Sequence, residues 1–460
     1  AVFLPMTYAY DLEMALYLLL GLYVGGISGG LVPAILINIP GTPSSITTTF
    51  DGYPMAKRGE GERALKIGIL SSFFGGMISL VCLWLFTPLL SAAALKFSAV
   101  EKFLIILFAL TVIAALSKGQ MLRGVFAGFL GVLTSLIGMF SVNNAYRMVP
   151  AMFKSKMQDG FQLLPVLIGL FAIAQIFEEA EEGMRFKIDK VDGEMDGKST
   201  FSFKDFKGQG INLLRSSLIG TGIGILPGIG GSTSGMLSYV TAKNMSKHPE
   251  EFGKGNPEGI VATESANNAT IGGAMIPLLV LGIPGDGVTA MMLCGFLIHG
   301  LSAGPLLFVK NGDVVYGIFA ACIVCTLIML VVEWTCIKGF VQVLKVPKHI
   351  LLPLILVLCC VGAYATNNRI FDVQSILIFG LVGYIYHKFS LPTTPFVLCF
   401  LIGEMLETYL RRGIMQYKSF GAFFARPIFD AFFFVAIGVL VWTVMKELKA
   451  YKIKKQSIDQ

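Results

Sequence analysis

The sequence predicts an all-α polytopic membrane protein with about 10–12 transmembrane helices, some of them broken or re-entrant. Three observations carry this prediction. The composition is 55% hydrophobic and 14% charged, with a mean hydropathy of +0.73, whereas soluble domains carry about 25% charged residues. Apolar runs long enough to cross a bilayer recur along the chain. Two of these regions, 244 residues apart, repeat each other.

The predicted spans are apolar runs separated by short polar or glycine-rich stretches. Full-length runs lie at 13–28, 64–86, 100–117, 121–140, 162–178, 208–226, 259–282, 312–335, 349–366, 372–388 and 428–446. Shorter pieces, which we interpret as half-helices or re-entrant segments, lie at 30–39, 88–97, 229–243, 287–299 and 393–410.

The two repeated regions both interrupt an apolar helix with Pro-Gly. The Ile-Pro-Gly of 39–41 aligns with that of 283–285 without a gap, and Pro33 aligns with Pro277. Bare backbone is costly in hydrocarbon, so such breaks persist only where they line a cavity or are buried in protein. Paired breaks in corresponding halves indicate the binding site of a transporter. We expect the two breaks to face one cavity near the bilayer midplane.

The chain is divided at its one long hydrophilic stretch. We expect a first transmembrane repeat over 1–179, a hydrophilic linker without a ligand site over 180–208, a second repeat over 209–427, and a C-terminal helix with a basic tail over 428–460. By transporter precedent we expect the repeats to be inverted. Pro227-Gly228 of the second repeat lacks a counterpart in the first, so a matching element is expected upstream of Ala1.

The net charge of +7 does not indicate nucleic-acid binding, because the basic residues lie at the ends of apolar runs. Lysines clustered directly after a span place that end in the cytoplasm. A cytoplasmic C-terminus follows from the lysines of the tail, which are Lys446, Lys449, Lys452, Lys454 and Lys455.

The residues expected to bind substrate are prolines, glycines and small polar residues around the breaks. Amides freed at the N-terminus of a half-helix bind carboxylates, and nearby hydroxyls add hydrogen bonds. The alternative is that these glycines only allow close helix packing. The expected set is Pro40, Gly41, Thr42, Pro43, Ser44, Ser45, Gly228, Gly230, Gly231, Ser232, Pro284, Gly285, Asp286 and Gly287.

The residues expected to bind a coupling cation, Na⁺ or H⁺, are Asn38, Ser265, Asn267 and Asn268. Amide and hydroxyl oxygens suit Na⁺, and polar groups inside a span are functional by default. Two alternatives stay open. Asn267 and Asn268 could instead cap a helix at the interface, and Asp286 could ligate a cation, carry a proton or cap a half-helix. We expect no organic cofactor and no metal beyond Na⁺.

Two further features are expected to be structural. Segment 51–59 is interpreted as an interfacial loop, with a role in the site as the alternative. Glu407 and Arg411 are spaced for an ion pair on one helix face. An intramembrane aspartyl protease would need a second acid beside Asp286, for which Asp11 is a weak candidate. We therefore expect no enzyme.

The motifs together resemble one family, the large membrane subunit of tripartite tricarboxylate transporters (TctA-like). The resemblance covers essentially the whole chain, and three of its blocks are highly specific: 51–59, 264–268 and 281–285. It also includes Gly25-Gly26, Gly29-Gly30, the Ile-Pro-Gly of 39–41, Ala64-Leu65, 225–231, 252–255, Glu258-Gly259, Glu101, 169–171 and 426–428.

The resemblance implies a multi-pass permease of the bacterial inner membrane that imports small organic di- or tricarboxylates by ion-driven symport. It also implies two partners, a small four-helix membrane subunit (TctB-like) and a periplasmic substrate-binding protein (TctC-like). We expect alternating access with an elevator-like motion. The alternative function is an uncoupled anion channel or uniporter.

Overall fold

The computed structural model describes residues 3–115, 121–140, 145–181, 201–228, 230–343, 348–417 and 421–425, with single residues and short runs from there to 445. In this part of the chain the secondary structure is almost entirely helical, and the strands described form one short hairpin. The predicted all-α class is therefore confirmed.

The chain divides into two compact units. We call the first the break unit, because it contains both Pro-Gly breaks; it comprises Met6–Ala92 and Glu179–Ile355. Its helices, some of which extend past these limits, are η1 (Pro5–Ala9), α1 (Leu12–Gly29), α2 (Leu31–Ile37), η2 (Pro43–Ser45), α3 (Thr49–Met55), η3 (Ala56–Glu60), α4 (Gly61–Ala94), η6 (Phe203–Phe206), α9 (Gly210–Ile225), α10 (Gly230–Met245), η7 (Pro249–Glu251), α11 (Pro257–Leu281), α12 (Gly287–Ile298), α13 (Pro305–Lys310) and α14 (Gly312–Val343).

The flanking unit comprises Ala1–Pro5, Ala93–Glu178 and Leu356–Gln460. Each unit thus takes sequence from both predicted halves. The elements of the flanking unit are α5 (Ala99–Ala115), α6 (Met121–Ser135), β1 (Gly138–Phe140), β2 (Ala145–Arg147), η4 (Ala151–Phe153), α7 (Leu163–Leu167), η5 (Ile168–Ile173), α8 (Ala174–Glu181), α15 (Lys348–Asn367), α16 (Ile370–Lys388), α17 (Thr393–Tyr417) and η8 (Gly421–Ala425).

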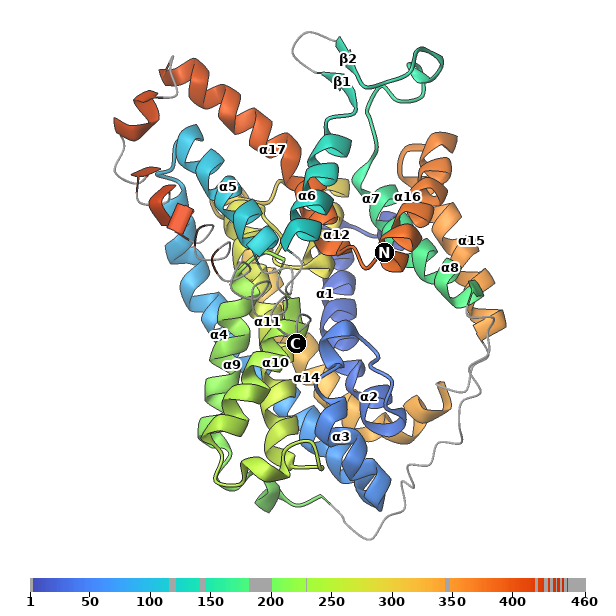
Figure 1. Ribbon diagram of the computed structural model, residues 1–460, viewed down its shortest axis with the longest axis vertical. Coiled ribbons are helices and arrows are strands. Elements are labelled where there is room, and N and C mark those ends of the chain that lie inside the picture. The colour runs from blue at the N-terminus through green and yellow to red at the C-terminus, as the bar shows by residue number, and fades with distance from the viewer. Residues whose placement is uncertain are drawn as a thin grey trace, which may run out of the picture. The chain divides into compact units, whose positions relative to one another are not determined.

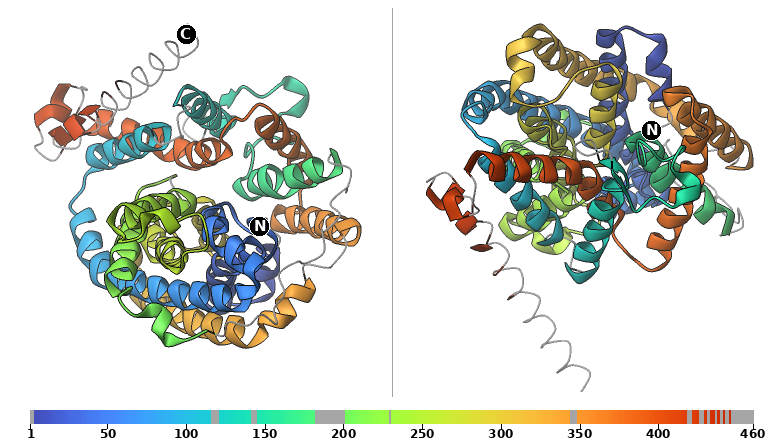
Figure 2. Two further views of the ribbon diagram at one scale, coloured as in Figure 1. Left: turned by 60° about the horizontal axis from the view of Figure 1, so that its bottom comes forward. Right: turned by 90° about the horizontal axis from the view of Figure 1, so that it is seen from above.

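The centre of the break unit is α11. It begins where the Asn256 side chain accepts a hydrogen bond from the Glu258 amide at 2.9 Å, with Pro257 at the first helical position, where proline is well tolerated. Every residue from Gly259 to Val280 is buried. Helices α9 and α10 run beside α11, and α1 runs beside α14 (Figure 1). Seen from its lower end, the unit encloses α11 within its other helices (Figure 2).

Five helical stretches of the described residues are long and apolar enough to cross a membrane. They are Leu12–Ile37, Thr49–Ala94, Leu163–Glu181, Gly312–Ile337 and Ile370–Lys388. The sequence-based count of crossings is higher. The run at 121–140, for example, is predicted as a full crossing but contains the shorter apolar helix Leu122–Ser135, whereas Gly287–Ile298 is short, as expected for the piece at 287–299.

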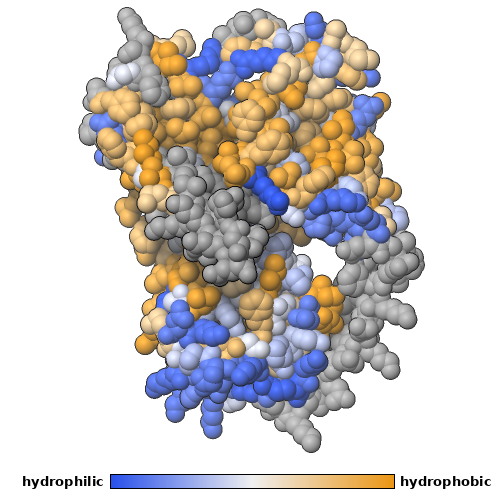
Figure 3. Space-filling model, in the orientation of Figure 1, coloured by the Kyte–Doolittle hydropathy of each residue, from blue (hydrophilic) through white to orange (hydrophobic). Residues whose placement is uncertain are grey.

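The surface of the break unit has a hydrophilic end. Figure 3 shows hydrophilic residues gathered at the end that carries α3, with apolar side chains above them. Exposed charged residues from η3, α10 and η7 contribute there, and the apolar surface includes Trp84 and Leu89 of α4, which are 56% and 68% exposed. Large exposed apolar side chains on a span are expected where lipid is the solvent.

The predicted Glu407–Arg411 ion pair is wrong. In the flanking unit both carboxylate oxygens of Glu407 accept hydrogen bonds from Arg147 of β2 at 2.9 Å, and this contact raises the pKa of the Arg147 guanidinium. Arg411 instead lies over the ring of Phe140, 4.6 Å from its centroid. A two-pronged arginine contact is stronger than an exposed pair along a helix.

Candidate functional site

The two breaks have the same backbone geometry. Helix α2 ends at Asn38 and α11 ends at Gly282, and both residues adopt the left-handed conformation, with φ of 58° and 73°. The next amide, of Ile39 or Ile283, reaches back to the carbonyl of Pro33 or Pro277 at 3.4 and 3.2 Å. The two members of each of these three pairs of positions are 244 residues apart. Asn38 therefore terminates a helix through its backbone, as Asn and Gly commonly do.

The turn after each break is closed by a capping box. The Thr42 amide donates to Ser45 Oγ at 3.2 Å, and the Asp286 amide donates to Thr289 Oγ1 at 2.9 Å. In return, the Thr289 amide donates to Asp286 Oδ1 at 2.8 Å. Of the three roles considered for Asp286, the structure shows the helix cap.

The second break is covered by protein. Residues 282–285 are buried, and the Gly228 amide, at the tip between α9 and α10, donates to the Gly285 carbonyl at 2.8 Å. Asp286 also accepts a hydrogen bond at 2.9 Å from the hydroxyl of Tyr23 on α1, a side chain that is 1% exposed. Two residues expected to bind substrate, Gly228 and Gly285, are thus brought together by the fold.

The first break is open. Residues 38–41 are exposed, and Gly41 and Thr42 line a cavity of about 710 Å³. Glycines of α1 form one wall, and α14 contributes apolar side chains and one carboxyl group, that of Glu333. The cavity is lined by Gly21, Gly25, Gly26, Gly29, Gly30, Val32, Pro33, Gly41, Thr42, Cys325, Ile328, Met329, Val332 and Glu333.

A second meeting point lies at Asn267, in the middle of α11. A Cβ on Gly231 would lie 2.7 Å from both Asn267 Oδ1 and Ser44 Cβ. Three expected site residues therefore converge from the first break, from the N-terminus of α10 and from α11. Within the described residues neither Asn267 Oδ1 nor Nδ2, both buried, meets the geometry of a hydrogen bond, although the amide group lies close to the carboxyl group of Glu264. Since α11 begins at Pro257, the alternative that Asn267 caps a helix is wrong.

One turn away, Glu264 is a buried carboxylate surrounded by hydroxyls. It accepts hydrogen bonds from Thr48 Oγ1 and from Ser72 Oγ, the latter at 3.0 Å. Asn268 Nδ2 donates to Ser72 Oγ at 2.7 Å, while Asn268 Oδ1 has no partner. Ser265, by contrast, donates to the Val261 carbonyl of its own helix at 2.6 Å.

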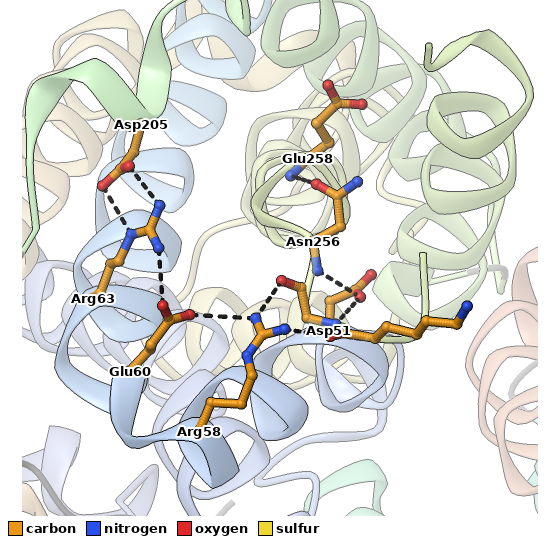
Figure 4. A network of polar contacts seen from close by, with 9 residues as sticks. Asp51, Arg58, Glu60, Arg63, Asp205, Asn256 and Glu258 are labelled. Atoms are coloured by element: carbon orange, nitrogen blue, oxygen red, sulfur yellow. Dashed lines mark hydrogen bonds and ion pairs between the residues drawn. The ribbon is translucent and has the colours of Figure 1, made fainter. Parts of the chain in front are cut away.

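Segment 51–59 organises the hydrophilic end of the break unit (Figure 4). Asp51 Oδ1 accepts hydrogen bonds from the amides of Gly253, Gly255 and Asn256 at 2.8 to 2.9 Å, and Oδ2 accepts one from Tyr239 at 2.9 Å. Three amides converging on one oxygen fix the loop that leads into α11. The segment itself is helical, in α3 and η3, and the predicted loop is wrong; its contacts at this end are structural.

The same end is tied to η6 by a charged network. Arg58 donates to the carbonyls of Lys254 and Gly255 at 2.8 Å, and Arg63 pairs with Asp205 at 2.8 Å and with Glu60 at 3.2 Å. Burial opposes ionisation of Asp205, but hydrogen bonds from Arg63 and the Ser202 amide outweigh it and lower the pKa of the carboxyl group. The rest of the predicted linker, 182–200, lies outside the described residues.

The sequence interpretation missed Glu333 and left Glu264 out of the cation site. A signal for both was present, because a lone acid inside an apolar run is functional by default. The protease hypothesis gains nothing from the fold, since Asp11 accepts a hydrogen bond from the Met14 amide at the start of α1, while Asp286 caps α12.

Long apolar helices, two of them broken in register around buried polar groups, define a multi-pass membrane protein with the architecture of a transporter. The chain belongs to the tripartite tricarboxylate transporter TctA family, whose model matches residues 1–398. The protein is therefore a tricarboxylate transporter subunit.

Two relatives come from Agrobacterium vitis. "Uncharacterized 52.8 kDa protein in TAR-I ttuC' 3'region" is 31% identical over 99% of this chain and 90% of its own length. "Uncharacterized protein in TAR-II ttuC' 3'region" is 33% identical over 52% of this chain and 98% of its own length. No solved structure matches the chain.

Proposed function

We propose that the protein is the large permease subunit of a tripartite system that imports small organic di- or tricarboxylates by ion-driven symport and alternating access. The observation that carries the proposal is Asn267. An amide buried at the centre of a protein normally has its hydrogen bonds satisfied, whereas both polar atoms of Asn267 are unpartnered at a point where three broken segments meet.

The substrate carboxylate would be held at this meeting point. Gly231, in the first turn of helix α10, packs against Ser44 and Asn267. A helix N-terminus favours anions, and Asn267 Nδ2 would donate an additional hydrogen bond. The Ser44 hydroxyl lies 3.0 Å from Thr42 Oγ1, and Thr42 lines the cavity, so we propose that substrate would approach the site from the cavity past Thr42.

The coupling Na⁺ would lie beside the substrate. Asn267 Oδ1 and Asn268 Oδ1 are free acceptors, and Glu264 supplies a negative charge within one helical turn. Oxygen ligands of this type suit a hard monovalent cation. A cation at this position would also offset the charge of a bound carboxylate.

Alternating access rests on the proposed repeats. Tyr23 contacts Asp286. In the 244-residue register, Tyr23 corresponds to Asn267 and Asp286 corresponds to Thr42. Asn267 does lie beside Ser44, the bonding partner of Thr42. This reciprocal arrangement supports two halves related by a two-fold axis. The TctB-like and TctC-like partners, the bacterial inner membrane and the cytoplasmic C-terminus belong to the same proposal; the basic tail lies outside the described residues.

Uptake by the complete complex in proteoliposomes tests the proposal. Labelled citrate and succinate would be offered under a Na⁺ gradient, a pH gradient, or neither. Asn267→Ala and Asn268→Ala should each raise the Na⁺ concentration for half-maximal uptake by about tenfold, the equivalent of one lost hydrogen bond to a charged group. Asn244→Ala, an exposed position on α10, is the matched control.

Two results would overturn this assignment. Unchanged Na⁺ dependence in both Asn267→Ala and Asn268→Ala would remove the cation site. Uptake that persists at full rate after both gradients are collapsed would favour the alternative of an uncoupled channel or uniporter.

A further inference from the structure

Glu333 is a buried acid with no part in the site proposed above. It lies on α14 within Gly312–Ile337, a membrane-length stretch with a mean hydropathy of 2.7. Its side chain is 4% exposed and forms part of the wall of the cavity. A carboxyl group in such a helix is costly and marks an ion or proton pathway more often than a structural contact.

The hydrogen bond found for Glu333 comes from a neutral group. Ser28 Oγ of α1 donates to Glu333 Oε2 at 2.8 Å. No ion pair of Glu333 is found within the residues that the structure describes. A buried carboxylate without a cationic partner pays a large desolvation cost, which a proton removes. Geometry therefore favours an exchangeable proton at this carboxyl group.

The charged groups named here on the neighbouring helices do not offset the cost of ionising Glu333. Lys66 of α4 is paired with Glu62 at 2.6 Å. Glu264 of α11 has the same sign as Glu333 and adds repulsion. On α1 the tyrosine nearest in sequence to Ser28 is Tyr23, which is bonded to Asp286.

Of the remaining titratable groups, Lys338 follows five residues after Glu333 on α14, and its side chain lies outside the described residues. Helix α2 carries no titratable residue, and the other titratable residues of α1, Glu13 and Tyr17, lie toward its start. Within α14 itself, the described residues that share the cavity with Glu333 include one thiol, that of Cys325.

We infer that Glu333 is a proton-exchange site on the cavity wall, and that its protonation admits an organic carboxylate beside the first break. The second half of this inference rests on the proposed transport function. Gly41 and Thr42 line the same cavity, so an entering carboxylate meets Glu333. Two negative charges repel strongly away from water, whereas the neutral acid does not. Each carboxylate would thus enter with one proton on Glu333, and that proton returns to water when substrate leaves.

Proton occupancy can be measured without any transport. Dicyclohexylcarbodiimide partitions into apolar cavities and reacts with protonated carboxyl groups: the acid adds across one C=N bond, and the adduct rearranges to a stable N-acylurea without losing an atom. Membrane vesicles carrying the full-length protein would be labelled across a pH series, and modified peptides identified by mass spectrometry. We expect labelling at Glu333 that falls as pH rises.

Three variants make this labelling experiment decisive. Glu333→Gln should abolish the modification of this peptide, and Asp313→Asn, which removes an exposed acid from the same helix, should leave it unchanged. Ser28→Ala removes a donor that stabilises the charged form, so the labelling midpoint should rise by about one pH unit. Absence of labelling at every pH in folded protein, or an unchanged midpoint in Ser28→Ala, would overturn the proton site.

The second part of the inference, that protonation of Glu333 admits the carboxylate, is tested by two modes of citrate transport. Glu333→Gln mimics the permanently protonated acid, so exchange of internal for external citrate should persist while uptake driven by a pH gradient falls at least tenfold. Preserved exchange shows that the variant is folded. If uptake by Glu333→Gln still follows the pH gradient at the parental rate, Glu333 has no role in coupling. If the parent transports nothing, the proposed function fails, and labelling still decides whether Glu333 exchanges a proton.

Discussion

The two breaks share a backbone and differ in their surroundings. Both end a helix in a left-handed residue, reach back to a proline carbonyl and close a capping box, at positions 244 residues apart. The second break is buried beneath the tip of the α9–α10 hairpin, whereas the first is exposed at the cavity. Local sequence thus determines the shape of the break, and the packing around it determines whether a ligand can approach. Three sets of substitutions test this comparison.

The largest effect is expected at Gly285. A Cβ there would lie 2.7 Å from the Gly224 carbonyl oxygen and 2.8 Å from Ala274 Cα, both of them backbone atoms in a buried site. Gly285→Ala should therefore lower the free energy of unfolding by about 3 kcal/mol. Gly41→Ala, although its Cβ would come within 2.9 Å of Gly30 Cα, should cost only about 1 kcal/mol, because the exposed break can move into the cavity. Thermal unfolding in detergent compares them, and equal losses would contradict the difference in burial.

An intermediate effect is expected at Asp286. Asp286→Ala removes the helix cap and leaves the buried Tyr23 hydroxyl unpaired, so we expect a loss of about 2–3 kcal/mol. Thr42→Val, at the equivalent position of the open break, should lose about 0.5–1 kcal/mol. Adding Tyr23→Phe to Asp286→Ala should recover about 1 kcal/mol, since no hydroxyl is then left unpaired. Strict additivity of the two substitutions would show that the contact between them contributes nothing.

The smallest effect is expected at Asp205, which ties η6 to the helix that follows the first break. Because the folded-state pKa of Asp205 is lowered, its contribution is present above the unfolded pKa of about 3.9 and is lost as pH falls through the folded value. We expect a loss of at most about 1 kcal/mol below pH ~4, reduced by solvent screening at this partly exposed pair. The free energy of unfolding, measured as a function of pH, should show this loss at low pH in the parent protein but not in Asp205→Asn.

Sequence reasoning succeeded where the determining interactions are local. The breaks were predicted in the correct register because proline, a left-handed residue and glycine act on their own few neighbours. It did not anticipate the partner of Glu407, because Arg147 lies 260 residues away and helix periodicity offers only Arg411. It treated Asn38 as a ligand from its polarity, although the backbone conformation of this residue ends α2.

The residues that line the cavity could not be predicted from the sequence either. Glu333 and Thr42 meet only because α1, α2 and α14 pack together, and no spacing within the chain encodes that meeting. Similarly, Ser265 and Asn267 look equivalent in the sequence, but the Ser265 hydroxyl is used by its own helix while Asn267 is left without a partner.

The cluster around Asp51 has a consequence for how the protein is made. Its carboxylate lies in the first third of the chain, but its amide donors are residues 253, 255 and 256. During synthesis the ribosome must add about 200 more residues before these donors leave the exit tunnel. The early helices therefore enter the bilayer with an acid that has not yet met its partners, at the polar end where water can solvate it. Closure of this loop ties the late helices to the early ones, and the break unit, which extends to Ile355, can become a single folded body only after it.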